Sequence, residues 1–169
     1  MAVTESRPRA SRARLAGVFV AVAGAVYVAD RVTKLLAERH LAGREPVTVI
    51  PGVLDLRYTT NSGGAFGVLG GAPWLFFTAA VGVGAIVLVA AWRTWSIGSE
   101  VGLGLVFGGA LGNLTDRVLH ASRPGGQVTD FIHLHHWPVF NVADSCIVIG
   151  ALVLAVAGGR RRDRATGGR

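Results

Sequence analysis

Four long stretches of this 169-residue chain contain no charged side chain. They are Leu15–Ala29, Tyr58–Trp92, Val101–Thr115 and Ser145–Gly159. A helix needs about 20 mainly apolar residues to cross a hydrocarbon core about 30 Å thick. Only the second stretch is long enough by itself, and we expect its helix to begin near Pro73, because proline is tolerated in a first helical turn. The other three reach that length only when they are extended past an aspartate, so three predicted spans carry a carboxylate near one end.

The placement of charge predicts how these spans are oriented. The net charge is +7, and ten cations and three anions in the two chain ends and one short loop account for it. The cations are Arg7, Arg9, Arg12, Arg14, Arg93, Arg160, Arg161, Arg162, Arg164 and Arg169. Basic residues beside short loops mark the cytoplasmic side of a membrane. Four spans with both termini in the cytoplasm satisfy this rule at every loop. They leave no basic face for RNA or DNA, so we expect no nucleic-acid partner.

We therefore predict a membrane all-α bundle with a basic cytoplasmic arm and a basic cytoplasmic tail. The expected boundaries are 1–14 for the arm, about 15–40, 73–92, 101–120 and 140–159 for the spans, and 160–169 for the tail. Two segments with strand character, Val47–Ile50 and Val53–Tyr58, flank a Pro51-Gly52 turn. They predict a small extracytoplasmic β-element over about 43–66, between the first two spans. The third span is rich in glycine at four-residue spacing, a pattern that lets helices approach closely in lipid.

This topology places the strongly polar residues of the predicted spans and outer segments at one membrane surface. These residues are Asp30, Lys34, Asn61, Asn113, Asp116, Arg117, Asp130, Asn141 and Asp144. A charge inside a span costs ~2.5–3.5 kcal/mol at its centre, and such residues usually face the bundle interior and mark function. Two plainer interpretations stay open. Asp30 and Lys34 fit ordinary interfacial charges, and Asn141 or Asp144 fits a helix N-cap.

Among protease chemistries, a pair of carboxylates fits this polar cluster best. The sequence lacks the His-Glu-x-x-His helix of zinc proteases, and we interpret His133–His136 as an interfacial segment rather than a metal site. A Ser–Lys dyad would need a serine beside Lys34, and no serine has a distinctive context. Two adjacent aspartates share one proton, so that the ionised one activates water and the protonated one donates to the peptide carbonyl. The residues themselves leave this pair open among Asp30, Asp116, Asp130 and Asp144. For Asp116 we favour a structural ion pair with Arg117.

Five short motifs follow one another along the chain. They are D-x-x-T-K at Asp30–Lys34, N-x-G-x-A-F at Asn61–Phe66, G-G-A-L-G-N-x-x-D-R at Gly108–Arg117, V-x-D-F-I at Val128–Ile132 and F-N-x-A-D at Phe140–Asp144. Together they resemble the lipoprotein signal peptidase (signal peptidase II) family over the whole spanning region. The second motif departs from the family pattern N-x-G-A-A-F, because Gly64 stands in place of its first alanine.

The resemblance implies a catalytic pair, a substrate and a location. It assigns catalysis to Asp130 and Asp144, in an aspartic endopeptidase that removes the signal peptide from diacylglyceryl-modified prolipoproteins by cleaving just before the lipidated lipobox cysteine. The positions it assigns to the substrate and inhibitor site are Asp30, Lys34, Asn61, Gly63, Asn113, Arg117 and Asn141. It also implies contact with membrane lipids, inhibition by globomycin-type compounds and no need for a metal or an organic cofactor. The expected location is the bacterial cell (inner or cytoplasmic) membrane, with the active site near the extracytoplasmic face.

Two other classes of protein compete with this interpretation. A small proton-coupled membrane transporter also buries carboxylates between helices, but it would place them near the middle of the membrane. A non-catalytic scaffold would use the glycine-rich third span for assembly, and it gives no reason for the Asp130–Asp144 arrangement. We therefore favour the peptidase and keep the transporter as the alternative.

Overall fold

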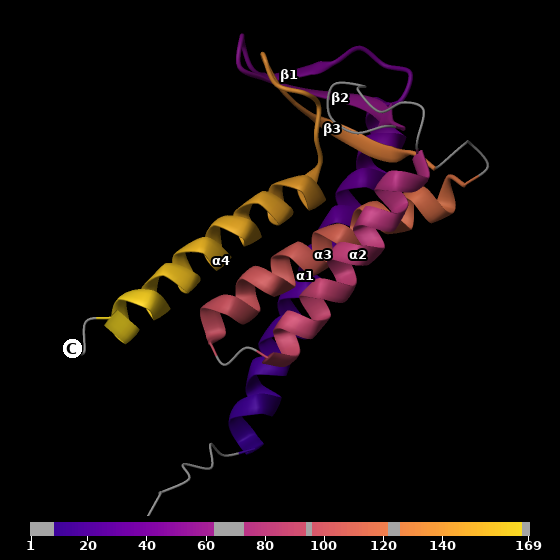
Figure 1. Cartoon of the computed structure of the whole chain (residues 1–169). Coiled ribbons are helices and arrows are strands. Elements are labelled where there is room, and N and C mark those ends of the chain that lie inside the picture. Colours follow the sequence, from indigo (N-terminus) through magenta and orange to yellow (C-terminus); the bar gives the residue numbers. More distant parts are fainter. Residues whose placement is uncertain (1–8, 63–72, 94–95, 122–125, 167–169) are drawn as a thin grey trace, which may run out of the picture.

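Four helices and a three-stranded sheet form the part of the chain that the computed structural model describes, which comprises residues 9–62, 73–93, 96–121 and 126–166. The elements are α1 (Arg9–Leu41), β1 (Val47–Ile50), β2 (Leu54–Asn61), α2 (Pro73–Arg93), α3 (Ile97–Leu119), β3 (Val128–Leu134) and α4 (Val142–Thr166). The helices lie alongside one another, and the sheet covers one end of them (Figure 1). The first turn of α1 and the last turn of α4 lie at the end away from the sheet (Figure 1).

Three of the described helices are long and apolar enough to cross a membrane, over Arg12–Leu41, Ile97–Leu119 and Val142–Gly159, and α2 adds a shorter apolar stretch, Thr78–Arg93. Large apolar side chains such as Val20, Ile86 and Leu152 are 65%, 71% and 62% exposed. Apolar surface that extends over several helices marks contact with a membrane rather than with water. The predicted class, a mostly helical membrane protein with a small sheet, is confirmed. The number of spans and the orientation of the termini stay predictions.

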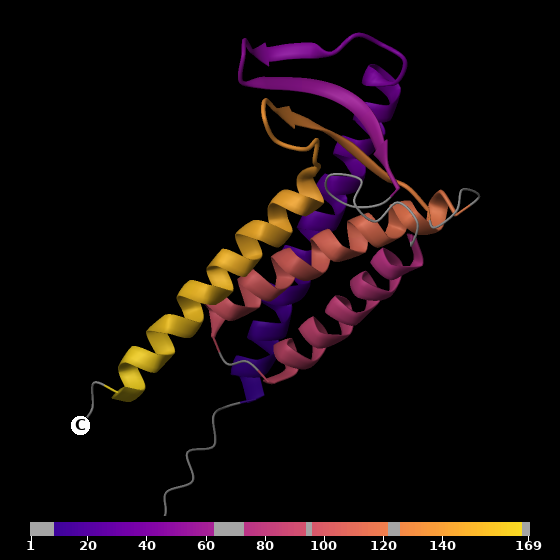
Figure 2. The same cartoon turned by 45° about the horizontal axis from the view of Figure 1, so that its top comes forward.

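Helix α3 is central because it contacts each of the other three helices (Figure 2). Glycines on one of its faces let α1 approach: a Cβ at Gly108 would lie 2.6 Å from the carbonyl oxygen of Ala23. A second face lets α4 approach, and a Cβ at Gly109 would lie 2.6 Å from the carbonyl oxygen of Ala143. The four-residue spacing of glycine predicts the first contact. The second contact, which Gly109 shares with Gly102 seven residues earlier, is missed by that spacing.

The helices extend further than the apolar stretches alone predict. Helix α1 begins at Arg9, inside the predicted arm, and α4 continues to Thr166, inside the predicted tail. Arginine is a good helix former, so a helix that packing has already nucleated continues into these basic segments. Helix α3 begins at Ile97, four residues before the predicted start, and carries Glu100 in its first turn. A carboxylate there interacts favourably with the positive end of the helix dipole.

The sheet contains one strand more than the sequence predicts. Strands β1 and β2 form the expected hairpin, and β3 joins the far side of β2 in antiparallel register, so the strand order is β1-β2-β3. The segment Val128–Ile132 is rich in β-branched and aromatic residues, which is a strand signal that the sequence interpretation left unused. Phe131 of this strand packs on Ala37 and Leu41 of α1. The sheet is thereby fixed to the end of the helical bundle.

The beginning of α4 is tied to β3 by backbone hydrogen bonds. The Ile132 N–H donates to the Phe140 carbonyl over 2.8 Å, and the Phe140 N–H donates to the Ile132 carbonyl over 3.0 Å. Asp130 therefore lies two residues before Ile132, one side of this backbone pair. Asn141 and Asp144 follow shortly after Phe140, the other side of the pair. Sequence positions up to 14 residues apart are brought together here at the edge of the helical bundle.

Candidate active site

Asn141 connects the two candidate catalytic aspartates. Its side-chain amide Nδ2 donates to Asp130 Oδ1 over 2.6 Å. Its Oδ1 accepts from the Asp144 backbone N–H over 2.9 Å, while the Asn141 backbone N–H donates to Asp144 Oδ2 over 3.3 Å. This reciprocal arrangement is a capping box, in which two helix residues three apart satisfy each other's free N–H groups. The N-cap interpretation is therefore correct for Asn141, and Asp144 is held by the same cap.

Asn113 of α3 provides a second link between the same groups. Its Nδ2 donates to Asp144 Oδ1 over 2.8 Å. Its Oδ1 accepts from Lys34 Nζ over 2.8 Å and from Asn141 Nδ2 over 3.2 Å. Asn61, at the end of β2, also hydrogen-bonds the Asp130 side chain. Side-chain amides of Asn61 and Asn141 thus orient Asp130. The side-chain amide of Asn113 in α3 orients Asp144 in α4.

The two aspartates lie in different surroundings. Asp130 is only 2% exposed, whereas Asp144 is half-buried. Burial, together with the negative charge of Asp144, raises the pKa of Asp130 to about 7. Hydrogen bonds from Asn141 and Asn61 act in the opposite direction on that pKa but do not offset the loss of water. A carboxyl group in this position holds a proton near neutral pH.

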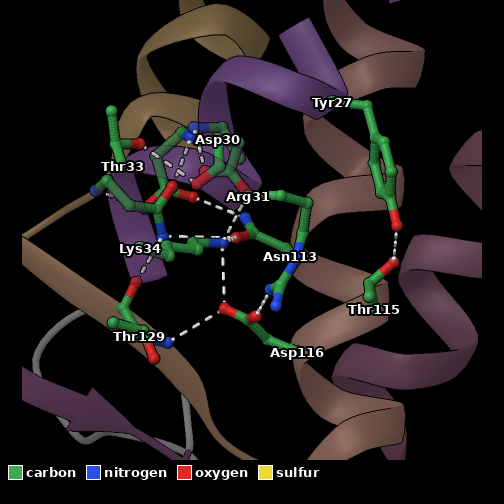
Figure 3. Close-up of polar contacts among 12 residues, drawn as sticks. Tyr27, Asp30, Arg31, Thr33, Lys34, Asn113, Thr115, Asp116 and Thr129 are labelled. Atoms are coloured by element: carbon green, nitrogen blue, oxygen red, sulfur yellow. Dashed lines mark hydrogen bonds and ion pairs between the residues drawn. The ribbon is translucent and has the colours of Figure 1, made fainter. Parts of the chain in front are cut away.

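The buried ammonium group of Lys34 lies between the carboxylates of Asp30 and Asp116 (Figure 3). Lys34 Nζ lies 2.8 Å from Asp30 Oδ2 and 3.0 Å from Asp116 Oδ2, and Arg31 also pairs with Asp116. Asp30 is 0% exposed, Asp116 1% and Lys34 2%. A Cβ at Gly112 would collide with the Asp30 carboxylate, so the glycine is what allows α1 to place this charge against α3. The interfacial interpretation of Asp30 and Lys34 is therefore wrong.

The two carboxylates that hold Lys34 also bind the backbone of the neighbouring elements. Asp30 Oδ1 accepts from the Ala143 N–H over 2.9 Å at the start of α4. Asp116 Oδ2 accepts from the Thr129 N–H over 3.1 Å, directly before Asp130 in β3. Thr129 and Ala143 each adjoin a candidate catalytic aspartate in the sequence. The buried ion pairs consequently fix the backbone on which the two aspartates stand.

Arg117 completes the charged network. It interacts electrostatically with Asp130, Asp144 and Asp116, and the interaction with Asp116 is the smallest of the three. The favoured structural ion pair between Asp116 and Arg117 is therefore a minor interaction, and Asp116 forms close ion pairs with Arg31 and Lys34 of α1 instead. Adjacent helical residues do not face each other, which is why neighbours in sequence are poor partners here.

The structure brings together every predicted site residue that it describes. Asp130 and Asp144 are joined through Asn141 and Asn113, and Asn61, Lys34, Asp30 and Arg117 surround them. Gly63 lies outside the described residues. Sequence reasoning missed Arg31 and Thr129 as members of the network. Arg31 adjoins a candidate site residue, but only the packing of α1 on α3 reveals its partner.

The buried ammonium leads to a test of the network. Replacing Lys34 with Met should lower the free energy of unfolding by about 3–5 kcal/mol, because Asp30 and Asp116 lose the charge that compensates their burial. Thermal or denaturant unfolding in detergent measures the change. The matched control is Arg39→Met, which removes an exposed cation from the same helix. Equal effects of the two substitutions would contradict the assignment of Lys34 as the central counter-ion.

Comparison with known proteins places this geometry in a family context. The family model described as signal peptidase (SPase) II matches residues 22–158. The lipoprotein signal peptidase of Rhodococcus jostii (strain RHA1) is 46% identical over 143 residues, which cover 80% of this chain and 69% of the relative. That of Syntrophomonas wolfei is 41% identical over 143 residues, covering 82% and 93%. A solved structure described as a bacterial membrane enzyme superposes with a TM-score of 0.77 at 29% identity, covering 90% of this chain and 92% of that one.

Proposed function

The chain belongs to the signal peptidase II family, and on that premise we propose that it is an aspartic endopeptidase that uses Asp130 and Asp144 to remove signal peptides from prolipoproteins. Processing of prolipoprotein signal peptides follows from the family. The aspartic mechanism and the identity of the two catalytic residues are our inference. The observation that carries it is the hydrogen bond from Asn141 to Asp130, made by the same residue that caps Asp144.

The charge of the network supports a shared proton. Its described members contribute four carboxyl groups and three cations. The carboxyl groups are Asp30, Asp116, Asp130 and Asp144, and the cations are Arg31, Lys34 and Arg117. With one proton on the Asp130–Asp144 pair, the cluster is neutral, which is the state that a buried site of low dielectric favours. The raised pKa of Asp130 also favours a proton on the pair near neutral pH.

The proposed reaction uses the two protonation states of the pair. The ionised carboxylate takes a proton from a water molecule as the water oxygen attacks the scissile peptide carbonyl. The protonated carboxyl group donates its proton to the carbonyl oxygen, which gives a neutral tetrahedral intermediate. The carboxyl group that took the water proton then donates it to the leaving nitrogen while the other carboxylate takes a hydroxyl proton from the intermediate, so the carbonyl re-forms, the C–N bond breaks and the pair again holds one proton. The pair titrates as a unit, so the roles of acid and base belong to the dyad rather than to either residue alone.

The other predicted residues divide into two proposed groups. Asp30 and Lys34 are fully buried, so we propose that they act by holding the start of α4 and the strand β3 in place. Asn61, Asn113 and Arg117 are half-buried beside the dyad, and we propose that they face the substrate or a globomycin-type inhibitor. Asn141 orients both catalytic carboxyl groups, and Gly63 stays a proposed contact from the sequence resemblance alone.

We propose further that the substrate is a prolipoprotein whose lipobox cysteine carries diacylglycerol, cut just before that cysteine. The polar network joins α1 and α3 to β3 and to the start of α4, and the sheet covers one end of the helices (Figure 2). A substrate anchored by a lipid and by a membrane-spanning signal helix presents its scissile bond at such an end, where lipids surround the bundle. A transporter is not favoured, because its carboxylates would lie near the middle of the membrane.

Substitution of either aspartate tests the dyad. Asp130→Asn and Asp144→Asn should each lower the rate of cleavage of a lipid-modified prolipoprotein by about 10²–10⁴-fold or more, because a carboxamide cannot exchange the proton. The rate is measured on purified protein in detergent, with unfolding as a check on structure. Glu45→Gln, which neutralises an exposed carboxylate near the sheet, is the matched control and should leave the rate unchanged. Full activity of either aspartate variant rules out the dyad.

The pKa of Asp130 leads to a second test. The pKa of Asp130 is raised to about 7, so the pair holds its shared proton below about that pH and loses it above. We expect kcat/KM to fall as the pH rises through about 7, because loss of the shared proton leaves the pair without an acid that can donate. The pH profile of kcat/KM is measured at constant ionic strength from about pH 5 to about pH 9, which is about two pH units on either side of the pKa. A rate that keeps rising up to the alkaline end contradicts a shared proton.

We propose that both termini lie in the cytoplasm and that the dyad lies near the extracytoplasmic face of the bacterial cell membrane. The start of α1 and the end of α4 both lie at the end of the helices away from the sheet (Figure 1), which supports this orientation. The basic residues at both ends of the chain support it as well. A topology reporter fused after Arg93 should report cytoplasm, and one inserted within 120–127 should report the exterior. A cytoplasmic signal from the second position overturns this orientation.

A further inference from the structure

Three side chains on the external sheet converge in a way that the proposed reaction does not use. Asp55 of β2, His133 of β3 and His135 directly after β3 place their ligand atoms within 4.8 Å of one another. They form the one such group of His, Cys, Asp and Glu side chains in the described part of the chain. The sequence interpretation treated His133–His136 as an interfacial segment, because the sequence alone does not show that Asp55 lies beside it.

The register of the sheet creates this group. Asp55 is the direct cross-strand partner of His133. His135 lies in the turn directly after β3, and its ring lies 5.3 Å from that of His133. The His135 N–H donates to the Val53 carbonyl over 3.0 Å. Two of the three ligands therefore stand on paired strands, and a backbone hydrogen bond holds the turn that carries the third.

The distances suit a small metal ion. His135 Nε2 lies 2.8 Å and His133 Nδ1 lies 3.7 Å from Asp55 Oδ2. Bonds of 2.0–2.2 Å from zinc to nitrogen or oxygen place two ligands of a tetrahedral ion roughly 3.4 Å apart. The observed separations lie on either side of that value. The imidazole rings are 5.3 Å apart and tilted by 33°, and the three ligand atoms lie within 4.8 Å of one another, so the side chains have to turn toward a common ion to bind it.

An ordinary ion pair explains the group less well. The imidazoles of His133 and His135 both lie near Asp55 Oδ2, but only that of His135 is within hydrogen-bond distance of it. Two protonated imidazoles side by side would repel each other, whereas two neutral imidazoles and a carboxylate are a common metal-binding set. The Asp55 side chain also accepts a hydrogen bond from Thr48, its partner on β1. Such support from a neighbouring residue is usual for metal-binding carboxylates.

The group is accessible from outside. The side chains of Asp55, His133 and His135 are 17%, 21% and 35% exposed. An ion can reach them from solvent, and water can occupy the fourth position that three protein ligands leave open.

We propose that Asp55, His133 and His135 bind one divalent transition-metal ion, for which Zn²⁺ is the best match, and that the ion links β2 to β3. The proposal is independent of the peptidase assignment, because none of the three residues belongs to the dyad or its network. The ion would stiffen the strand that carries Asp130, three residues before His133. It has no part in the proposed proton transfers.

Zinc titration of the full-length protein tests this site. The protein is purified in detergent with an affinity tag that contains no histidine, stripped with a chelator and titrated with Zn²⁺ alone. We expect saturable binding of one ion per chain by calorimetry and by elemental analysis, and a rise in the thermal midpoint on binding. His133→Ala and Asp55→Asn should weaken binding by about 100-fold or more, since each removes a ligand, and Thr48→Val by about 10-fold.

The matched control is His136→Asn. His136 adjoins the group, is exposed and has a φ of 69°, a backbone conformation that asparagine tolerates. This variant should bind Zn²⁺ like the parent protein. The proposal is overturned if the parent shows no saturable binding of one ion, or if His136→Asn weakens binding as much as His133→Ala does. Neither readout depends on cleavage of a substrate, so failure here leaves the peptidase proposal standing, and failure of that proposal leaves this one.

Discussion

The contact on which the polar end of this protein depends is the buried ammonium of Lys34 between two buried carboxylates. Lys34, Asp30 and Asp116 are each at most 2% exposed, so none of these charges is stabilised by water. Removing one partner from a buried set leaves an uncompensated charge, which costs far more than the loss of an exposed pair. Asp30 Oδ1 accepts from the Ala143 N–H, and Asp116 Oδ2, which also pairs with Lys34, accepts from the Thr129 N–H. One set of charges therefore positions both the strand and the helix that carry the proposed dyad.

The packing of α3 is what makes this charge arrangement possible. Glycine allows the backbone of α1 to approach on one face and that of α4 on another. At Gly112 the space of a missing side chain is filled by the Asp30 carboxylate itself. In lipid, where helices gain little from hydrophobic association, close backbone contact and buried hydrogen bonds supply much of the association energy. The same residue type thus serves the packing of the bundle and the geometry of its polar end.

Asn141 shows how a local structural device supports chemistry. Its side chain caps α4 and also donates to Asp130, so the start of the helix and the orientation of the acid are set together. A cap and a functional residue are often treated as alternative explanations of a polar residue at a helix start. Here both apply, because the capping box uses the side-chain oxygen of Asn141, and the side-chain nitrogen of Asn141 donates to Asp130 of β3.

The class of protein and the neighbourhood of the site follow from the sequence alone. Uncharged stretches predict the helices, and the order of the five motifs identifies the family and, through it, leads to Asp130 and Asp144 as the proposed dyad. The β-branched residues around Asp130 are enough to predict the third strand, but the sequence does not show which strand it pairs with. The partners become visible only in the folded chain: Asp116 lies with Arg31 and Lys34, Asp30 with the start of α4, and Asp55 with two histidines. The physical reason is that periodicity and hydropathy report on one segment at a time. The partner of a buried charge depends on which distant backbone comes within about 3 Å of it.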